Sequence, residues 1–289
     1  APLSSINSQK KTTETDYGVI GFIGAGNMAN SLIRGMIAKG AEKSSIWATD
    51  LDSNKLYTLN SECGIRTGST AAIANNADII VLAVKPQVMK AVCAELKPLL
   101  GERSPLIISI AAGITVSHLS QWIGANTAAI RCMPNTPALV GKGASGLYAN
   151  EHVSQTQKDM AEKVISSVSL CVWVEQEAEI DAVTALSGSG PAYFFLFMES
   201  MQKSAQEMGL SEDVARILTK QTALGAAELA MASDESTERL RLNVTSPGGT
   251  TEQAIKQFQL GGLPKLVDTA LKSAQSRSIE LASQFDEKS

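Results

Sequence analysis

The periodicity of apolar and polar residues changes near residue 175 of this chain. From Tyr17 to about Val174, short apolar runs alternate with segments of helical periodicity. The six runs expected to form strands are YGVIGFIG, SSIWATD, ADIIVLAV, PLIISIAAG, AAIRCM and CVWVEQ. Several are apolar throughout, which is typical of parallel strands that helices cover on both faces. This alternation predicts an α/β fold with a doubly wound sheet.

After about Glu175 the pattern is helical. One expected helix opens with SGSGPAY and continues through FFLFMESMQKSAQEM, where apolar residues recur at steps of three and four. Gly209 is expected to end it, and Ser211 is a suitable N-cap for the next helix. Further helices are expected after Thr250 and from about Pro264. We therefore predict a disordered tail over residues 1–16, an α/β domain over 17–175 and an all-α domain over 176–289.

Composition narrows the possible function. With 44% hydrophobic and 19% charged residues the chain is an ordinary globular protein, and its net charge of −4 argues against nucleic-acid binding. The longest apolar run, ADIIVLAV, is too short to span a bilayer. The four cysteines are widely separated without metal-ligand spacing, and the polar start lacks a secretory signal. We expect a cytoplasmic protein with no nucleic-acid or membrane partner and no metal.

The first expected strand runs into a glycine motif that opens a helix, GFIGAGNMANSLIRGMI. Gly24, Gly26 and Ala29 fit the pattern G-x-G-x-x-A. The first glycine makes a tight turn, the second lets backbone approach a pyrophosphate, and the alanine permits close helix packing. The next expected strand ends in Asp50, about 20 residues on, where an acidic residue meets the adenosine ribose. The residues 17–175 are therefore predicted to form a dinucleotide-binding domain.

Asp50 bears on the choice of nucleotide. A carboxylate there accepts hydrogen bonds from a ribose 2′-OH but repels a 2′-phosphate, which favours NADH over NADPH. The alternative is that Asp50 points to solvent, and Asp52 either compensates for its charge or adds to it.

A second glycine-rich stretch, SPGGTT, lies in the helical half. One interpretation is a plain turn between helices, with Thr250 or Thr251 as the N-cap. The other is an anion cradle: Gly248 and Gly249 let backbone approach closely, Ser246 and both threonines donate from hydroxyls, and the following helix N-terminus favours a carboxylate.

Five motifs together resemble the pyrroline-5-carboxylate reductase family. In chain order they are AVKP, SIAAG, RCMPNTPALV, SGSGPAY and SPGGTTEQA. The resemblance runs from about Tyr17 almost to the C-terminus. It implies a Rossmann domain followed by a helical dimerisation domain, a homodimer with intertwined helical domains, and further assembly into rings. It also implies hydride transfer from NADPH or NADH to the C=N carbon of 1-pyrroline-5-carboxylate, which gives L-proline.

The resemblance also assigns site residues. The implied cofactor residues are Ile23, Gly24, Ala25, Gly26, Asn27, Met28, Ala83, Val84, Lys85, Pro86, Ile110, Ala111 and Ala112. The implied substrate residues are Ser246, Gly248, Gly249, Thr250 and Thr251, with the Thr251 hydroxyl near the substrate nitrogen. Two features depart from the family. Asp50 stands where relatives often have a small hydroxylated residue. The His-Pro pair that many relatives have ahead of the SPGGTT loop is missing, and if this segment contributes a carboxylate, that carboxylate would be Asp234.

Other residues leave alternatives open. Asn135 either orients the nicotinamide carboxamide or braces its loop, and Lys85 approaches the nucleotide through its side chain or its backbone. SGSGPAY either forms a helix start or kink, with Ser189 as N-cap and Pro191 as the first helical residue, or packs beside the cofactor.

Two other functions compete with imine reduction as interpretations of the sequence. The first, β-hydroxyacid dehydrogenation, generally needs a His or Lys as acid–base catalyst. The two histidines, His118 and His152, belong to no motif, and Lys203 lies about three turns beyond SGSG. The second, a non-catalytic nucleotide sensor, has no need of the SPGGTT cradle.

Overall fold

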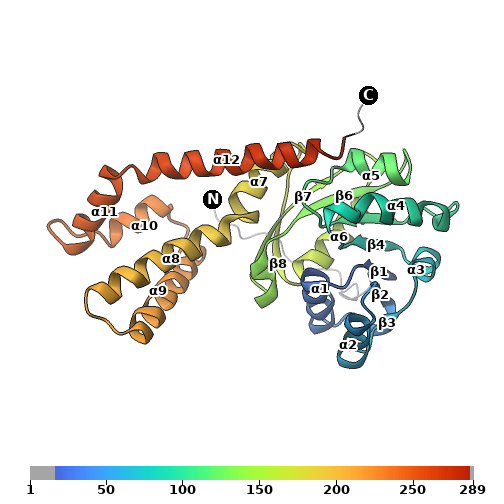
Figure 1. Ribbon diagram of the computed structural model, residues 1–289, viewed down its shortest axis with the longest axis horizontal. Helices are drawn as coiled ribbons and strands as arrows, with labels where there is room; N and C mark the ends of the chain where they lie inside the picture. The colour runs from blue at the N-terminus through green and yellow to red at the C-terminus, as the bar shows by residue number, and fades with distance from the viewer. Residues whose placement is uncertain (1–16, 287–289) are drawn as a thin grey trace. The chain divides into compact units, whose positions relative to one another are not determined.

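The computed structural model describes residues 17–286, so the tail predicted over residues 1–16 lies outside the described part (Figure 1). The chain divides into two compact units. Of the described residues, unit 1 holds 17–188 and 276–286, and unit 2 is Ser189–Gln275. Within residues 17–286, every helix is too short or too polar to cross a bilayer.

Unit 1 is built on a sheet whose strand order is β3-β2-β1-β4-β5-β6-β7-β8. The strands are β1 (Ile20–Ile23), β2 (Ile46–Thr49), β3 (Arg66–Thr67), β4 (Ile79–Leu82), β5 (Leu106–Ser109), β6 (Ala129–Met133), β7 (Gly143–Ala149) and β8 (Ser169–Trp173). All six predicted strands are present. The short β3 and the whole of β7 were not predicted.

Helices cover both faces of the sheet, as the apolar strands predicted. One face carries α1 (Asn27–Ala38), α2 (Ser53–Cys63) and α6 (Gln155–Ser166), and the other carries α3 (Thr70–Asn76), α4 (Pro86–Leu100) and α5 (Val116–Ile123). Neighbouring strand residues point to opposite faces, so Val81 packs in the core under α1, α2 and α6, and Leu82 packs in the core under α3, α4 and α5. The doubly wound sheet is therefore confirmed.

The last two strands depart from the parallel arrangement. β7 pairs antiparallel with β6, and β8 pairs parallel with β7. The connection explains the reversal, because only a short 3₁₀ turn, η2 (Thr136–Val140), joins β6 to β7. A parallel return needs a crossover of a dozen or more residues.

Unit 2 is helical, as predicted. It contains α8 (Gly190–Glu207), α9 (Glu212–Ala232), α10 (Thr237–Asn243), α11 (Thr250–Leu260) and the first part of α12 (Leu263–Ser283). Ser211 caps α9 by accepting from the Val214 N–H at 3.3 Å, which confirms that prediction.

Ser189 takes the predicted N-cap position of α8, and Pro191 lies in the first turn. A short helix, α7 (Glu179–Val183), continues into a π turn, η3 (Thr184–Gly188), and then into α8. Ser189 therefore already has helical dihedral angles, and its side chain makes no cap hydrogen bond.

Candidate active site

The carboxyl ends of the parallel strands β1, β4 and β5 bring three predicted cofactor segments together at one end of the sheet. The helices after β1 and β4 lie on opposite faces, so the gap between these strands is the switch point where doubly wound sheets bind ligands. Backbone bonds tie the segments together: the Ala83 N–H donates to the Ile23 carbonyl at 2.8 Å, and the Ile110 N–H donates to the Leu82 carbonyl at 3.2 Å. The segments gathered here are Ile23–Met28, Ala83–Pro86 and Ile110–Ala112.

Gly24 makes the tight turn after β1. Its φ of +101° is a left-handed conformation that favours glycine. A Cβ built on it would lie 2.4 Å from the Ala83 carbonyl oxygen, which is backbone and cannot move aside. The Gly24 N–H donates to the Thr49 carbonyl at 2.9 Å, so this turn joins β1 to both neighbouring strands.

Gly26 has a different role from Gly24. It is the N-cap of α1 with an ordinary φ of −74°, and no side chain caps the helix there. A Cβ built on Gly26 would meet nothing within 4 Å. The space beside Gly26 is therefore open and the first N–H groups of α1 have no side-chain cap, which is the arrangement that binds phosphate groups at helix N-termini.

A cavity of about 490 Å³ adjoins this helix N-terminus. Its lining residues are Ala25, Gly26, Asn27, Asn30, Asn54, Lys55 and Thr58. The side chains of these residues provide three amides, one hydroxyl and one ammonium group, and none of them carries a carboxylate. The residues present thus fit an anionic cofactor. The sequence did not single out Lys55 or Asn54, because the α1–α2 groove forms only when both helices pack on the sheet.

Asp50 is turned toward the glycine loop. One carboxylate oxygen accepts from the Ala25 N–H and the other from the Asp52 N–H, each at 2.7 Å. The alternative that Asp50 merely points to solvent was therefore wrong. Each oxygen keeps a further lone pair, so a ribose hydroxyl can still donate to it. The side chain of Asp52 is used elsewhere, since it caps α2 by accepting from the Asn54 N–H at 3.0 Å.

Asn135 braces the loop that follows β6. Its side-chain oxygen accepts from the Ala144 N–H at 2.8 Å, and its amide nitrogen donates to the Ser187 carbonyl at 3.0 Å. These bonds join the loop to β7 and to the π turn. The structure therefore shows the bracing role, and contact with a nicotinamide stays a prediction. Lys85 is the exposed N-cap of α4, with Pro86 as the first helical residue, so it shapes the turn through its backbone.

The SPGGTT loop joins α10 to α11 in unit 2. Neither threonine caps α11, because the N-cap is Gly249, and the predicted Thr250 or Thr251 cap was wrong. Gly248 has a left-handed φ of +74°, and its N–H donates to the Glu252 side chain at 3.2 Å. The first turn of α11 thus has no side-chain cap and leaves N–H groups for a ligand. Thr251, the second residue of this helix, is half-buried.

Neither histidine is placed for catalysis. His118 is buried and hydrogen-bonded at both ring nitrogens, and His152 pairs with Glu151 at 3.3 Å. Lys203 lies exposed near the end of α8, too far along the helix to serve as the catalytic lysine of a β-hydroxyacid dehydrogenase.

Two of the buried thiols are unreactive at neutral pH. Burial raises the pKa of Cys93 and of Cys132 to about 12, so the reactive thiolate is scarce at neutral pH. We predict that iodoacetamide at about pH 8 leaves both unmodified in the folded protein. Peptide mass spectrometry checks this, with the chain unfolded in guanidinium chloride as the control in which both react. Rapid labelling of either thiol in the folded protein would contradict the assignment.

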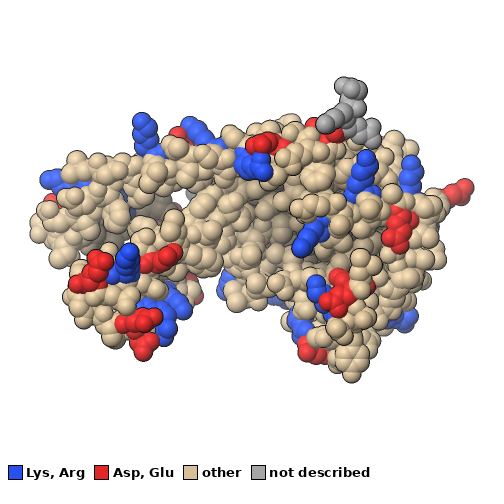
Figure 2. All heavy atoms as spheres, in the orientation of Figure 1, with Lys and Arg blue, Asp and Glu red and all other residues tan. Residues whose placement is uncertain are grey.

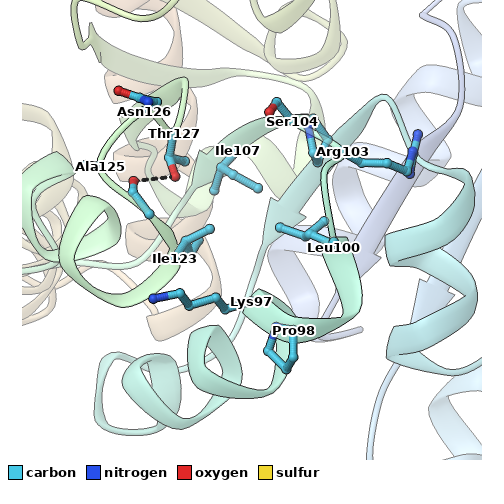
Figure 3. A pocket seen from close by; sticks show the side chains of 13 residues that line it. Lys97, Pro98, Leu100, Arg103, Ser104, Ile107, Ile123, Ala125, Asn126 and Thr127 are labelled. Carbon is cyan, nitrogen blue, oxygen red and sulfur yellow. Dashed lines mark hydrogen bonds between the residues drawn. The ribbon is translucent and has the colours of Figure 1, made fainter.

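A larger cavity, of about 560 Å³, lies at the opposite end of the sheet (Figure 3). It borders Ile107 at the start of β5 and Thr127 ahead of β6. Figure 3 shows Lys97 beside it, while the Arg103 side chain extends away. The Arg103 guanidinium donates to the Ala74 and Ala77 carbonyls. This cavity is therefore separate from the cofactor end of the sheet.

Comparison with known proteins gives matches in both halves of the chain. Residues 177–281 match the family described as pyrroline-5-carboxylate reductase dimerisation. Residues 19–113 match the family described as NADP oxidoreductase, coenzyme F420-dependent. The two matches cover the helical half and the cofactor end of the sheet.

Proteins similar to this chain over almost its whole length bear the same family name. A pyrroline-5-carboxylate reductase from Pseudomonas aeruginosa is 51% identical over 267 residues, which cover 92% of this chain and 97% of that protein. The solved structure of a pyrroline-5-carboxylate reductase from Coxiella burnetii has a TM-score of 0.89 and 46% identity, over 92% of this chain and 99% of that one. The NADP-bound pyrroline carboxylate reductase of Plasmodium falciparum has a TM-score of 0.80 and 29% identity, over 93% and 99%. The chain therefore belongs to the pyrroline-5-carboxylate reductase family.

Proposed function

We propose that this chain reduces 1-pyrroline-5-carboxylate to L-proline with NADPH or NADH, the final step of proline biosynthesis. The observation that carries the proposal is the near-complete coverage of a relative at 51% identity that bears this name. Two local features support it. The cofactor segments share one end of the sheet, and the SPGGTT loop ends in an uncapped helix N-terminus.

The bound nicotinamide nucleotide supplies the hydride. Residues of this chain hold the reactants: the N-terminus of α1 takes the pyrophosphate, and the N-terminus of α11 takes the substrate carboxylate. The Thr251 hydroxyl hydrogen-bonds the ring nitrogen. A cyclic iminium arrives already protonated, so orientation and a neutral hydroxyl suffice and no histidine is needed.

The test is direct. Purified protein is supplied with 1-pyrroline-5-carboxylate and either NADPH or NADH, and cofactor oxidation is followed together with proline formation. We expect turnover with at least one cofactor. Absence of turnover with both would falsify the proposal.

Cofactor preference depends on two opposite charges. Asp50 disfavours a 2′-phosphate, whereas the Lys55 ammonium lines the donor-rich cavity beside Gly26 and favours one. We predict that Asp50→Ser raises the ratio of kcat/KM for NADPH to that for NADH by about fivefold, the scale of one screened charge contact.

Lys55→Ala is the matched variant and is expected to lower the same ratio by about fivefold. Dissociation constants for both nucleotides, from isothermal titration calorimetry without substrate, give a readout besides activity. An unchanged ratio in Asp50→Ser would mean that Asp50 does not face the ribose, and an unchanged ratio in Lys55→Ala would mean that Lys55 does not face the 2′-phosphate.

The assembly proposed is a homodimer formed through unit 2, with rings of dimers as the higher assembly. Large apolar side chains are exposed on α8, and such patches mark interfaces. Those with more than half of their surface exposed are Phe194, Phe195 and Leu196. Figure 2 shows Lys and Arg side chains scattered among Asp and Glu on the visible face, which supports a small-molecule substrate over nucleic acid. The cytoplasmic location expected from the sequence remains part of this proposal.

A further inference from the structure

We propose that the C-terminal end of the chain positions the cofactor loop, residues 110–115, through four residues that we call the C-terminal clamp. They are Ser278, Ala282, Phe285 and Asp286. The inference rests on the proposed use of Ile110–Ala112 for cofactor binding. All four clamp residues belong to unit 1, although α12 begins in unit 2.

The clamp touches the cofactor loop at Gly113. This glycine has a left-handed φ of +74° and directly follows the cofactor segment Ile110–Ala112. A Cβ built on it would lie 3.6 Å from the Ala282 backbone nitrogen, which is van der Waals contact. The backbone of α12 therefore lies against the loop at Gly113.

A chain of hydrogen bonds links Asp286 to the end of the same loop. The Thr115 N–H donates to His118 Nδ1 at 3.0 Å, and the His118 N–H donates to Thr115 Oγ1 at 3.1 Å. Since Nδ1 is an acceptor, neutral His118 carries its proton on Nε2. That nitrogen donates to Asp286 Oδ1 at 2.7 Å. Asp286 thereby holds His118 in the tautomer that completes the cap of α5.

Phe285 reinforces the contact with α5. The rings of His118 and Trp122 stack with centroids 5.3 Å apart and planes at 11°. Phe285 meets both edge-on, at 6.1 Å from His118 and 6.5 Å from Trp122. Edge-to-face pairs at these distances stabilise beyond their buried area. His118 is buried, so this aromatic group fixes the ring that caps the loop.

Ser278 fastens the helix further from its end. It is the buried residue of α12, and its hydroxyl donates to Asp181 Oδ1 at 2.7 Å. Asp181 lies near the buried Arg131, whose pKa burial lowers and whose charged form Glu177 and Asp181 favour. This hydrogen bond joins the unit 1 part of α12 to α7, one turn of helix before Ala282.

The test compares single variants of the full chain. Phe285→Ala removes the aromatic contact, and Asp286→Ala removes the bond to His118. Asp286→Asn is the conservative rescue, because its amide oxygen accepts the same hydrogen bond. Asp268→Ala is the matched control on α12, since Asp268 pairs with exposed Lys272 at 2.8 Å.

Two readouts separate positioning from overall stability. Hydrogen–deuterium exchange of the peptide covering residues 110–118 is measured without ligand, and the Kd for NADPH is measured by calorimetry. We expect exchange about fivefold faster, and Kd about fivefold weaker, in Phe285→Ala and Asp286→Ala, the scale of one lost hydrogen bond or ring contact. Asp286→Asn and Asp268→Ala are expected to match the wild type in both.

Unchanged exchange, or faster exchange with an unchanged Kd, in Asp286→Ala would overturn the proposal. Asp286 is exposed, so this variant decides the matter even where Phe285→Ala does not fold. A wild-type chain that binds neither nucleotide would instead refute the proposed function, and the exchange measurement would still show whether the clamp orders the loop.

Discussion

Gly26→Ala is expected to weaken NADPH binding by about a hundredfold while lowering the stability of the folded protein by less than about 1 kcal/mol, because alanine is a poorer N-cap than glycine. The ordinary φ of Gly26 accepts an alanine, and the added methyl would meet no protein atom within 4 Å. It would instead fill the space beside the first N–H groups of α1, where the pyrophosphate is proposed to lie. Calorimetric Kd values measure the loss of NADPH affinity, and thermal denaturation measures the stability of the folded variant.

Gly24→Ala is the matched contrast, two residues away. Here the methyl would lie 2.4 Å from the Ala83 carbonyl oxygen, in a backbone conformation with φ of +101°. Strain of this kind costs about 1–3 kcal/mol before the clash is added. We therefore expect Gly24→Ala to lower the melting temperature by roughly 5 °C or more. If Gly26→Ala bound NADPH as tightly as the wild type, the cofactor would not approach this helix N-terminus.

Thr251→Ala is expected to lower kcat by roughly tenfold or more, which corresponds to about 1.4 kcal/mol for one lost transition-state contact. The structure makes this a clean test of the hydroxyl. Gly249, and not Thr251, is the N-cap of α11, so the substitution removes no helix cap. Alanine is also a good helix former, and the helix itself is expected to persist.

Thr251→Ser is the control for this prediction, because it keeps a hydroxyl at the same position. We expect it to retain most of the wild-type kcat when proline formation is followed at saturating substrate and cofactor. An alanine variant with unchanged kcat would remove Thr251 from the mechanism. A serine variant as slow as alanine would assign the effect to the threonine methyl group.

Local pattern was enough to predict the strands and helices that carry the cofactor segments. An apolar strand followed by Gly24, Gly26 and Ala29 specifies a turn and a helix through steric rules that act within a few residues. For the same reason the helical half and the cap at Ser211 were predictable. The five motifs then identified the family, because each preserves a local backbone shape in a fixed order.

Three features depended on residues distant in sequence. Asn135 bonds Ser187 across 52 positions, His118 bonds Asp286 across 168, and Asp50 bonds Ala25 across 25. A polar side chain has several possible partners, and only the packed fold decides which one lies within hydrogen-bonding distance. The antiparallel direction of β7 also depended on the tertiary structure. It follows from the short connection between β6 and β7, and the sequence pattern did not show β7 as a separate strand.

The sequence by itself therefore determined six of the eight strands, the helical half, the glycine turns and the family, because steric limits on a few neighbouring residues suffice for them. Only the tertiary structure decided that Asp50 faces the glycine loop, that Lys55 lines the adjoining cavity, and that α12 ends against α5. Those placements arise when helices pack on a sheet and bring together side chains that no local pattern pairs.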